Sequence, residues 1–161
     1  MKNEMLRRIG TATLAVLMIA MFTPILVSAQ EDGKNALVGV WNLQVSRRNC
    51  DTGAVIAVVP AMLTYHRGGT MSDWGTGMSP SLRSPGQGIW NFESDGHYSQ
   101  AFQFFRFNAD GTLAGKQVNR TNVTLFNNGN NILNNAVAQI FDVNGNLIAV
   151  NCSTALGTRF Q

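Results

Sequence analysis

Charged residues, histidine, proline and cysteine are all scarce in this chain. Of its 161 residues, 13% are Asp, Glu, Lys or Arg, and there are only two histidines, four prolines and two cysteines. Two histidines and two cysteines do not form a Cys/His cluster with the ligand spacing of a structural zinc site. We therefore expect no metal site and no cofactor.

The first 29 residues have the pattern of a signal peptide. Basic residues within the first eight positions precede an apolar stretch over residues 9–27, and the small residues of Val27-Ser28-Ala29 suit signal peptidase. We predict cleavage before Gln30, so that residues 1–29 are a signal peptide and residues 30–161 one exported domain. The alternative is an uncleaved anchor, because about 19 apolar residues can just span a bilayer.

The positive charge of the chain belongs mostly to this N-terminal segment. Residues 1–29 hold three of the 12 basic residues and one of the nine acidic ones, so the remainder has a net charge near +1. Without a stripe of Lys and Arg to follow a phosphate backbone, we expect no nucleic-acid partner. The remaining chain is long enough for one domain with a single core. We expect it to be secreted or periplasmic, with no membrane contact after cleavage.

Helical periodicity is missing as well, and turn signals divide the chain into runs of strand length. Asp-Gly and Asn-Gly pairs favour two-residue hairpins in which both central residues accept positive φ. A longer connection with two prolines covers residues 76–86. The runs between the turns predict an all-β fold, an antiparallel up-and-down β-barrel of about eight strands. They cover residues 37–49, 54–66, 69–75, 86–94, 97–108, 112–126, 131–143 and 146–160.

The first and last runs carry residues that define how the barrel would close. Pairing Trp41 with Arg159 gives a sum of residue numbers of 200, and pairing Cys50 with Cys152 gives 202, one diagonal step away. Parity predicts Trp41 and Arg159 inside the barrel and the cysteines on its outer face. The alternative to a Cys50–Cys152 disulfide is two free thiols.

Gly39-x-Trp41 on the first strand, the meander, and Arg159 near the chain end resemble the calycins, and lipocalins in particular. The resemblance implies a barrel whose floor is closed by Trp41, with Arg159 packed over the indole ring. The chain departs from lipocalins in having no helix candidate after the last strand and no Thr-Asp-Tyr motif. Avidin-like proteins also begin with a Gly-x-Trp strand and lack that helix, so the subfamily stays open. The pattern is also similar to that of small exported bacterial proteins without an assigned activity.

A barrel of this size either fills its interior with side chains or holds one small ligand. We predict that it binds a small, largely apolar molecule. The predicted ligand contacts are Trp74 and Trp90, beside the long connection, and Phe104 and Arg106, on a later strand. The phenylalanines around Phe104 could equally build a dry core.

No nucleophile elbow, carboxylate pair or His-rich signature appears, so we assign no catalytic residue and favour a protein without enzymatic activity. One alternative is a barrel cyclase or isomerase that uses His66, Glu93, His97 or Arg106. It requires at least two of these side chains to converge inside the barrel. The other alternative is a filled barrel that acts as an interaction or inhibitor protein through its loops. It predicts a solid interior and an exposed apolar patch at one rim.

Overall fold

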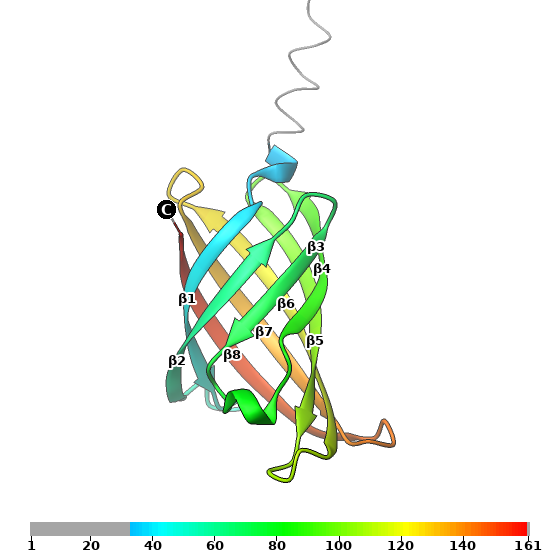
Figure 1. The fold of residues 1–161 in the computed structure, drawn as a ribbon. Helices are drawn as coiled ribbons and strands as arrows, with labels where there is room; N and C mark the ends of the chain where they lie inside the picture. Colours follow the sequence, from blue (N-terminus) through cyan, green and yellow to red (C-terminus); the bar gives the residue numbers. More distant parts are fainter. Residues whose placement is uncertain (1–32, 161) are drawn as a thin grey trace, which may run out of the picture. The chain divides into compact units, whose positions relative to one another are not determined.

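Residues 36–160 form one closed antiparallel β-barrel in the computed structural model, which describes residues 33–160 (Figure 1). Neighbouring strands in the sequence are neighbours in the sheet, and β8 pairs with β1. The predicted all-β fold and eight-stranded meander are therefore confirmed. The strands are β1 (Gly39–Arg48), β2 (Val55–Tyr65), β3 (Thr70–Gly75), β4 (Gly86–Ser94), β5 (His97–Phe107), β6 (Leu113–Phe126), β7 (Asn131–Phe141) and β8 (Leu147–Arg159).

The predicted signal peptide, residues 1–29, lies outside the described residues. Within residues 33–160 no helix has the length and apolar character needed to cross a membrane. A short 3₁₀ helix, η1 (Pro80–Leu82), interrupts the connection between β3 and β4.

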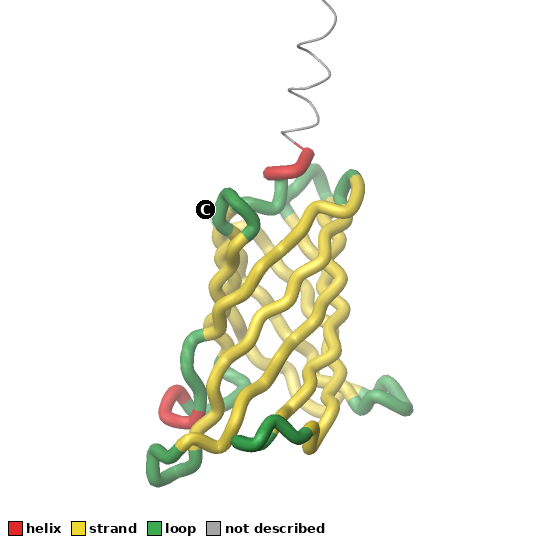
Figure 2. Tube along the Cα trace, turned by 90° about the vertical axis from the view of Figure 1, so that its right-hand side faces the viewer, coloured by secondary structure: helices red, strands yellow, loops and turns green. Residues whose placement is uncertain are grey.

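The two ends of the barrel differ in their connections (Figure 2). Residues 36–38 and the turns β2–β3, β4–β5 and β6–β7 lie at one end, which we call the floor. The connections β1–β2, β3–β4, β5–β6 and β7–β8 lie at the other end, which we call the mouth. The predicted long connection is observed at the mouth as residues 76–85, and we call it the mouth loop.

The hairpins differ from the expectation that both central residues have positive φ. Asn127 and Asn128 are the only residues other than glycine with positive φ in the described chain. In the Asp95-Gly96, Asp110-Gly111 and Asn144-Gly145 turns the glycine alone has it. A shift of ladder register accompanies each of these three hairpins. The chain thus uses one left-handed glycine and a local bulge where the dipeptides predicted two left-handed residues.

The barrel closes by pairing of β1 with β8, in the register that Trp41 and Arg159 predicted. The β1–β8 ladder runs without a shift from Trp41 opposite Arg159 to Arg48 opposite Cys152, a constant sum of 200. Cys50 follows the end of β1 and is bonded to Cys152, with a Cα–Cα distance of 5.2 Å. The predicted disulfide is therefore confirmed. Strand alternation assigns Cys152, like Arg48, to the outer face.

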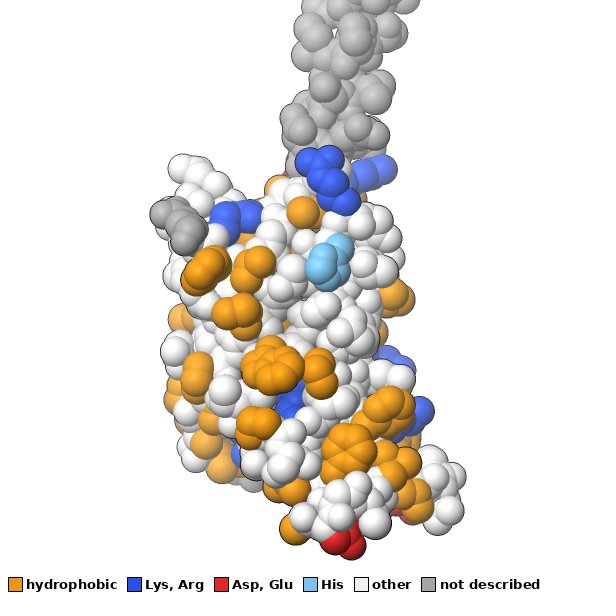
Figure 3. Space-filling model, in the orientation of Figure 1, with side chains coloured by type: hydrophobic (Ala, Val, Ile, Leu, Met, Phe, Trp, Pro, Cys, Tyr) orange, Lys and Arg blue, Asp and Glu red, His pale blue; other side chains and the backbone are white. Residues whose placement is uncertain are grey.

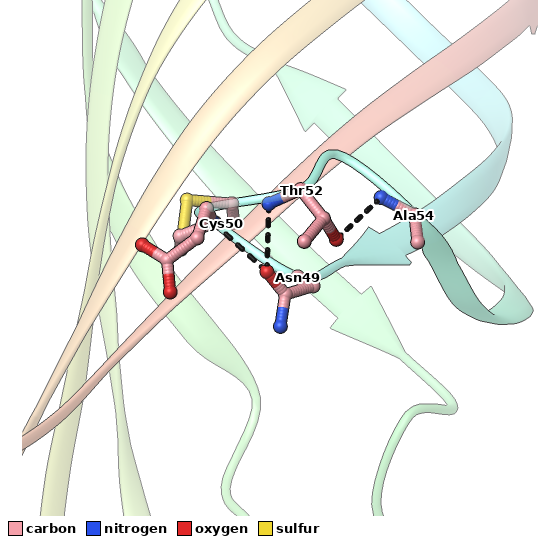
Figure 4. The surroundings of a disulfide bond; sticks show 6 residues. Asn49, Cys50, Thr52 and Ala54 are labelled. Atoms are coloured by element: carbon pink, nitrogen blue, oxygen red, sulfur yellow. Dashed lines mark hydrogen bonds between the residues drawn. A yellow bond between two sulfur atoms is a disulfide. The ribbon is translucent and has the colours of Figure 1, made fainter.

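The disulfide joins β8 to the turn between β1 and β2 (Figure 4). The Asn49 side chain accepts hydrogen bonds from the backbone N–H groups of Asp51 and Thr52, and Thr52 Oγ1 accepts one from Ala54. Such local bonds from Asn and Thr side chains hold a turn in place of a strand ladder. The covalent closure thus sits beside a turn that is itself ordered.

The floor half of the barrel is a filled apolar core. Trp90 packs edge-on between Tyr65 and Tyr98, with ring centroids 6.2 and 5.8 Å away. Such T-shaped pairs stabilise beyond the area that they bury. Further buried side chains complete this core, namely Leu37, Trp41, Leu43, Leu63, Met71, Val123 and Ile132.

Arg159 closes the floor by satisfying backbone carbonyls. Its guanidinium lies 4.3 Å from the centre of the Trp41 ring and donates hydrogen bonds to the carbonyls of Ala36, Val38 and Gly129. Trp41 Nε1 donates to the Leu37 carbonyl at 2.9 Å. One cation therefore fastens the segment before β1 to the turn between β6 and β7.

Candidate functional site

The mouth half of the barrel contains a cavity of about 280 Å³. Space remains there because four of the inward positions on β7 and β8 are small, whereas the floor half is filled by large rings. The small inward residues are Ala136, Ala138, Ser153 and Ala155. Residues of the mouth loop also line the cavity, so it extends toward the mouth of the barrel.

One side of the cavity is apolar. Val45 on β1 and Val59 and Leu63 on β2 line it, and we call these three residues the apolar wall. Phe102 and Phe104 on β5 add two aromatic rings to the lining. In a closed barrel of eight strands, β1 and β2 lie across from β5 and β6. The apolar wall therefore faces the inward-pointing side chains of β5 and β6 across the cavity.

The opposite side is polar and incompletely hydrogen-bonded. Asn119 and Thr121 on β6 and Asn134 on β7 are 7%, 5% and 4% exposed, and we call these three residues the polar row. Asn119 Nδ2, Thr121 Oγ1 and Asn134 Oδ1 find no hydrogen-bond partner among the described residues. Buried polar atoms in folded proteins are nearly always paired, so such a cluster around one cavity needs an explanation.

Gln100 and Tyr65 mark the boundary between the cavity and the core. The Tyr65 hydroxyl donates to Gln100 Oε1, and Gln100 faces Thr121 across the β5–β6 ladder. Burial raises the pKa of the Tyr65 hydroxyl, while a hydrogen bond with Asn134 opposes the shift. Tyr65 thus remains a protonated donor in the floor core, bonded to Gln100 of the cavity lining.

An ion pair ties the mouth loop to the barrel interior. Arg83, from the loop, pairs with Asp73 on β3 and lies 3.8 Å from the centre of the Phe104 ring. Burial raises the pKa of the Asp73 carboxyl, and the guanidinium of Arg83 opposes that shift. The Arg83 side chain also donates to the Ser84 carbonyl at 3.1 Å. The loop is therefore fastened by one side chain that reaches inward.

A second, smaller hollow of about 200 Å³ lies between Trp74 and the mouth loop. Met78, Pro80 and Pro85 supply much of its lining, together with Arg83, which also lines the larger cavity. On the outer surface Trp74 faces Met62 across the β2–β3 ladder. Exposed apolar side chains gather on the face of the barrel shown in Figure 3.

The four predicted ligand contacts occupy three different environments. Phe104 and Arg106 line the cavity. Trp74 is 56% exposed on the outer face and lines the smaller hollow. Trp90 is buried in the floor core, where its Nε1 donates to the His66 carbonyl at 3.0 Å. The structure thus brings together two of the four.

The groups considered for acid–base chemistry do not converge. His66, Glu93 and His97 are exposed, and Arg106 is the one of the four that lines the cavity. Elsewhere in residues 33–160, no three His, Cys, Asp or Glu side chains are grouped closely enough to hold a metal ion. The cyclase or isomerase alternative required two of those four side chains inside the barrel, and the structure supplies one.

The sequence left open whether Asn119 and Thr121 face inward, where they would suit a ligand with hydrogen-bonding groups, and it did not identify Asn134 or the role of Arg83. The run Gln117-Val118-Asn119-Arg120-Thr121-Asn122 is polar on both faces, so its alternation does not reveal which residues point inward. Pairing with β5 resolves this, because Asn119 faces Phe102, and Thr121 faces Gln100. Arg83 lies in an irregular connection, where no periodicity predicts the direction of a side chain.

No family model matches this chain, and no curated protein is significantly similar to it.

Proposed function

We propose that this protein is an exported binding barrel that holds one small molecule in the cavity at its mouth. The observation that carries the proposal is the cavity itself, with an apolar wall facing three buried polar side chains that each have one unpaired atom. Small-molecule sites are concave and mainly apolar, with a few polar groups that fix the orientation of the ligand. The largely apolar body of the ligand would pack on Phe102, Phe104 and the apolar wall.

The unpaired polar groups favour a ligand over a merely imperfect core. A buried donor or acceptor that loses its partner costs about 1–3 kcal/mol. Three such groups belong to the lining of one cavity, where water or a bound molecule can supply the missing partners. A bound molecule that pairs with them would recover part of that cost on binding.

The two alternative functions have less support from the described residues. An interaction protein built on a filled barrel predicts a solid interior, whereas this barrel is solid only in its floor half. A cyclase or isomerase lacks a second acid–base group beside Arg106 among the four candidates.

Resemblance and chemistry both support an exported calycin-like protein. The antiparallel barrel, Gly39-x-Trp41 and the contact of Arg159 with the Trp41 ring are the features that the calycin resemblance implies. The Cys50–Cys152 disulfide fits an oxidising compartment, because such bonds persist outside the cytosol. Together with the signal-peptide pattern, these features support a secreted or periplasmic location.

Titration with the neutral fluorescent probe 1-N-phenylnaphthylamine tests the proposal. We expect saturable binding that Ala136→Phe abolishes, because Ala136 lines the cavity and a phenyl ring there would fill it. Val137→Phe is the matched control, because Val137 is the next residue on β7 and is 47% exposed. Equal probe binding by both variants, each with the circular dichroism of the parent protein, would place the probe elsewhere and refute the proposal.

A further inference from the structure

The cavity carries more positive than negative charge. Arg47, Arg83 and Arg106 line it, and Asp73 is the one acidic residue in its lining. Asp73 pairs with Arg83 in the sole ion pair formed within residues 33–160. Two guanidinium charges therefore remain without an ionic partner. Arg106 is half-buried and Arg47 is exposed at the rim, and their combined positive field favours an anionic ligand over a neutral one of the same shape.

Both of these arginines lie near the mouth. Arg47 faces Ser153 close to the end of β1, and Arg106 faces Gly115 close to the end of β5. Arg106 is half-buried, and its Nε has no hydrogen-bond partner in the described part of the chain. A guanidinium matches the two oxygens of a carboxylate in geometry as well as in charge. The acid group of a ligand would therefore lie at the mouth.

The polar row lies deeper and follows the direction of β6. Asn119 and Thr121 are two residues apart, and Asn134 faces Val123, two residues further along. At about 3.3 Å per residue, the row is about 13 Å long. A ligand that enters beside Arg106 therefore meets hydrogen-bonding groups at its far end and along one edge.

We propose that the cavity selects a small ring carboxylate with a hydroxyl or carbonyl group remote from the acid. This inference rests on the proposed binding function and names the class of ligand. The carboxylate lies between Arg47 and Arg106, and the ring packs against the apolar wall. The remote oxygen exchanges a hydrogen bond with Thr121 Oγ1, which has no partner among the described residues. A straight-chain fatty acid would pair with the arginines but leave the polar row unsatisfied.

Calorimetric titration of the purified protein with three matched probes tests the ligand class. 6-Hydroxy-2-naphthoate has both polar groups, 2-naphthoate lacks the hydroxyl, and 2-naphthol lacks the acid. We expect 6-hydroxy-2-naphthoate to bind at least about tenfold more tightly than either of the others, because each missing group leaves a partner unpaired.

Substitutions test which residue is responsible for the preference for the carboxylate and which for the preference for the hydroxyl group. Arg106→Gln should weaken both carboxylates about tenfold and leave 2-naphthol unchanged. Arg120→Gln, on the outer face of β6, should change none of the three affinities, since the Arg120 guanidinium bonds to Gln139. Thr121→Val should remove the preference for the hydroxylated acid over 2-naphthoate while preserving the size of the side chain.

The outcomes separate this inference from the function on which it rests. If 1-N-phenylnaphthylamine binds in the cavity but the three naphthalene probes bind equally, the ligand class is overturned and the binding function stands. The same holds if Arg106→Gln weakens 2-naphthol as much as the acids. If 1-N-phenylnaphthylamine and all three naphthalene probes fail to bind, both proposals are overturned.

Discussion

Gly39 shows how a single residue makes the floor contact possible. Its φ is +137°, and a Cβ placed on it would lie 2.7 Å from Nη1 of Arg159. Residues with a side chain rarely adopt that backbone conformation, and a methyl group would also displace the guanidinium from the carbonyls that it satisfies. The Gly-x-Trp pattern thus has a steric reason here, since the glycine leaves room for Arg159 over Trp41.

Gly39→Ala is expected to destabilise the protein by about 1–3 kcal/mol through backbone strain and the clash with Arg159. Gly53→Ala is the control, because Gly53 also has positive φ but no atom lies within 4 Å of a Cβ built there. We expect it to cost about 1 kcal/mol, from strain alone. Urea unfolding of both variants measures the difference. Equal losses would mean that the Arg159 contact needs no space at residue 39.

The buried Asp73 carboxyl predicts a characteristic dependence of stability on pH. Burial raises its pKa in the folded protein, so the folded state binds this proton more tightly than the unfolded chain does. Its contribution to stability is complete below the ordinary aspartate pKa and is lost as the pH rises through the raised value. The free energy of unfolding of the parent, relative to Asp73→Asn, should therefore fall as the pH rises above about 4.

Asp142→Asn is a control for the Asp73 experiment, because the contribution of Asp142 to the free energy of unfolding depends on pH with the opposite sign. Hydrogen bonds from the Asn146 side chain and from backbone N–H groups lower the pKa of the Asp142 carboxyl. Its contribution is present above the ordinary aspartate pKa and is lost as the pH falls through the lowered value. Urea unfolding between pH 3 and pH 7 measures both differences. A flat profile for Asp73→Asn, or one that rises with pH, would contradict the account of Asp73.

At the scale of elements, the disulfide fastens the two strands that close the barrel at its mouth. It spans 102 positions of sequence, a long loop whose closure in the unfolded chain is entropically costly. Cys50→Ser with Cys152→Ser is expected to lower the free energy of unfolding by about 2–5 kcal/mol. The reduced parent should match the double variant in a thermal or urea melt. If reduction leaves the stability of the parent unchanged, the disulfide does not constrain the barrel.

Strand pairing could be predicted from the sequence where strands carry distinctive residues at their ends. Trp41, Arg159 and the two cysteines fixed the β1–β8 register, because side-chain alternation allows no slip of one residue. The glycines predicted where the turns lie, but they did not predict the backbone conformation of each turn. Asp-Gly and Asn-Gly permit two left-handed residues without requiring them, and the adjoining bulge selects the form that is observed.

The site could be predicted from the sequence only in part. Phe104 and Arg106 lie on a strand whose aromatic residues mark it as lining the interior. The polar row lies on β6 and β7, where polar residues occupy both faces. Whether such residues face inward depends on pairing with neighbouring strands. Whether their polar atoms find partners depends on the small residues beside them, since Ala138 pairs with Asn119 and Ala136 with Thr121. Neither the direction of these side chains nor their hydrogen bonding can be predicted from the sequence of one strand alone.

At the scale of the whole molecule, the barrel is divided into two halves with different roles. The floor half is packed with large rings and closed by Arg159, while the mouth half is hollow and lined by apolar and polar walls. A rigid floor of this kind holds the cavity walls at fixed separation, which pre-organises a binding site and lowers the entropic cost of occupying it.

A crystal structure of the protein with bound 1-N-phenylnaphthylamine tests the central claim, a hollow mouth half that holds one small molecule, most directly. The account predicts electron density for one probe inside the barrel, between Val59 of the apolar wall and Asn119 of the polar row. Probe density confined to the outer hollow beside Trp74, with side chains filling the interior between β2 and β6, would contradict it.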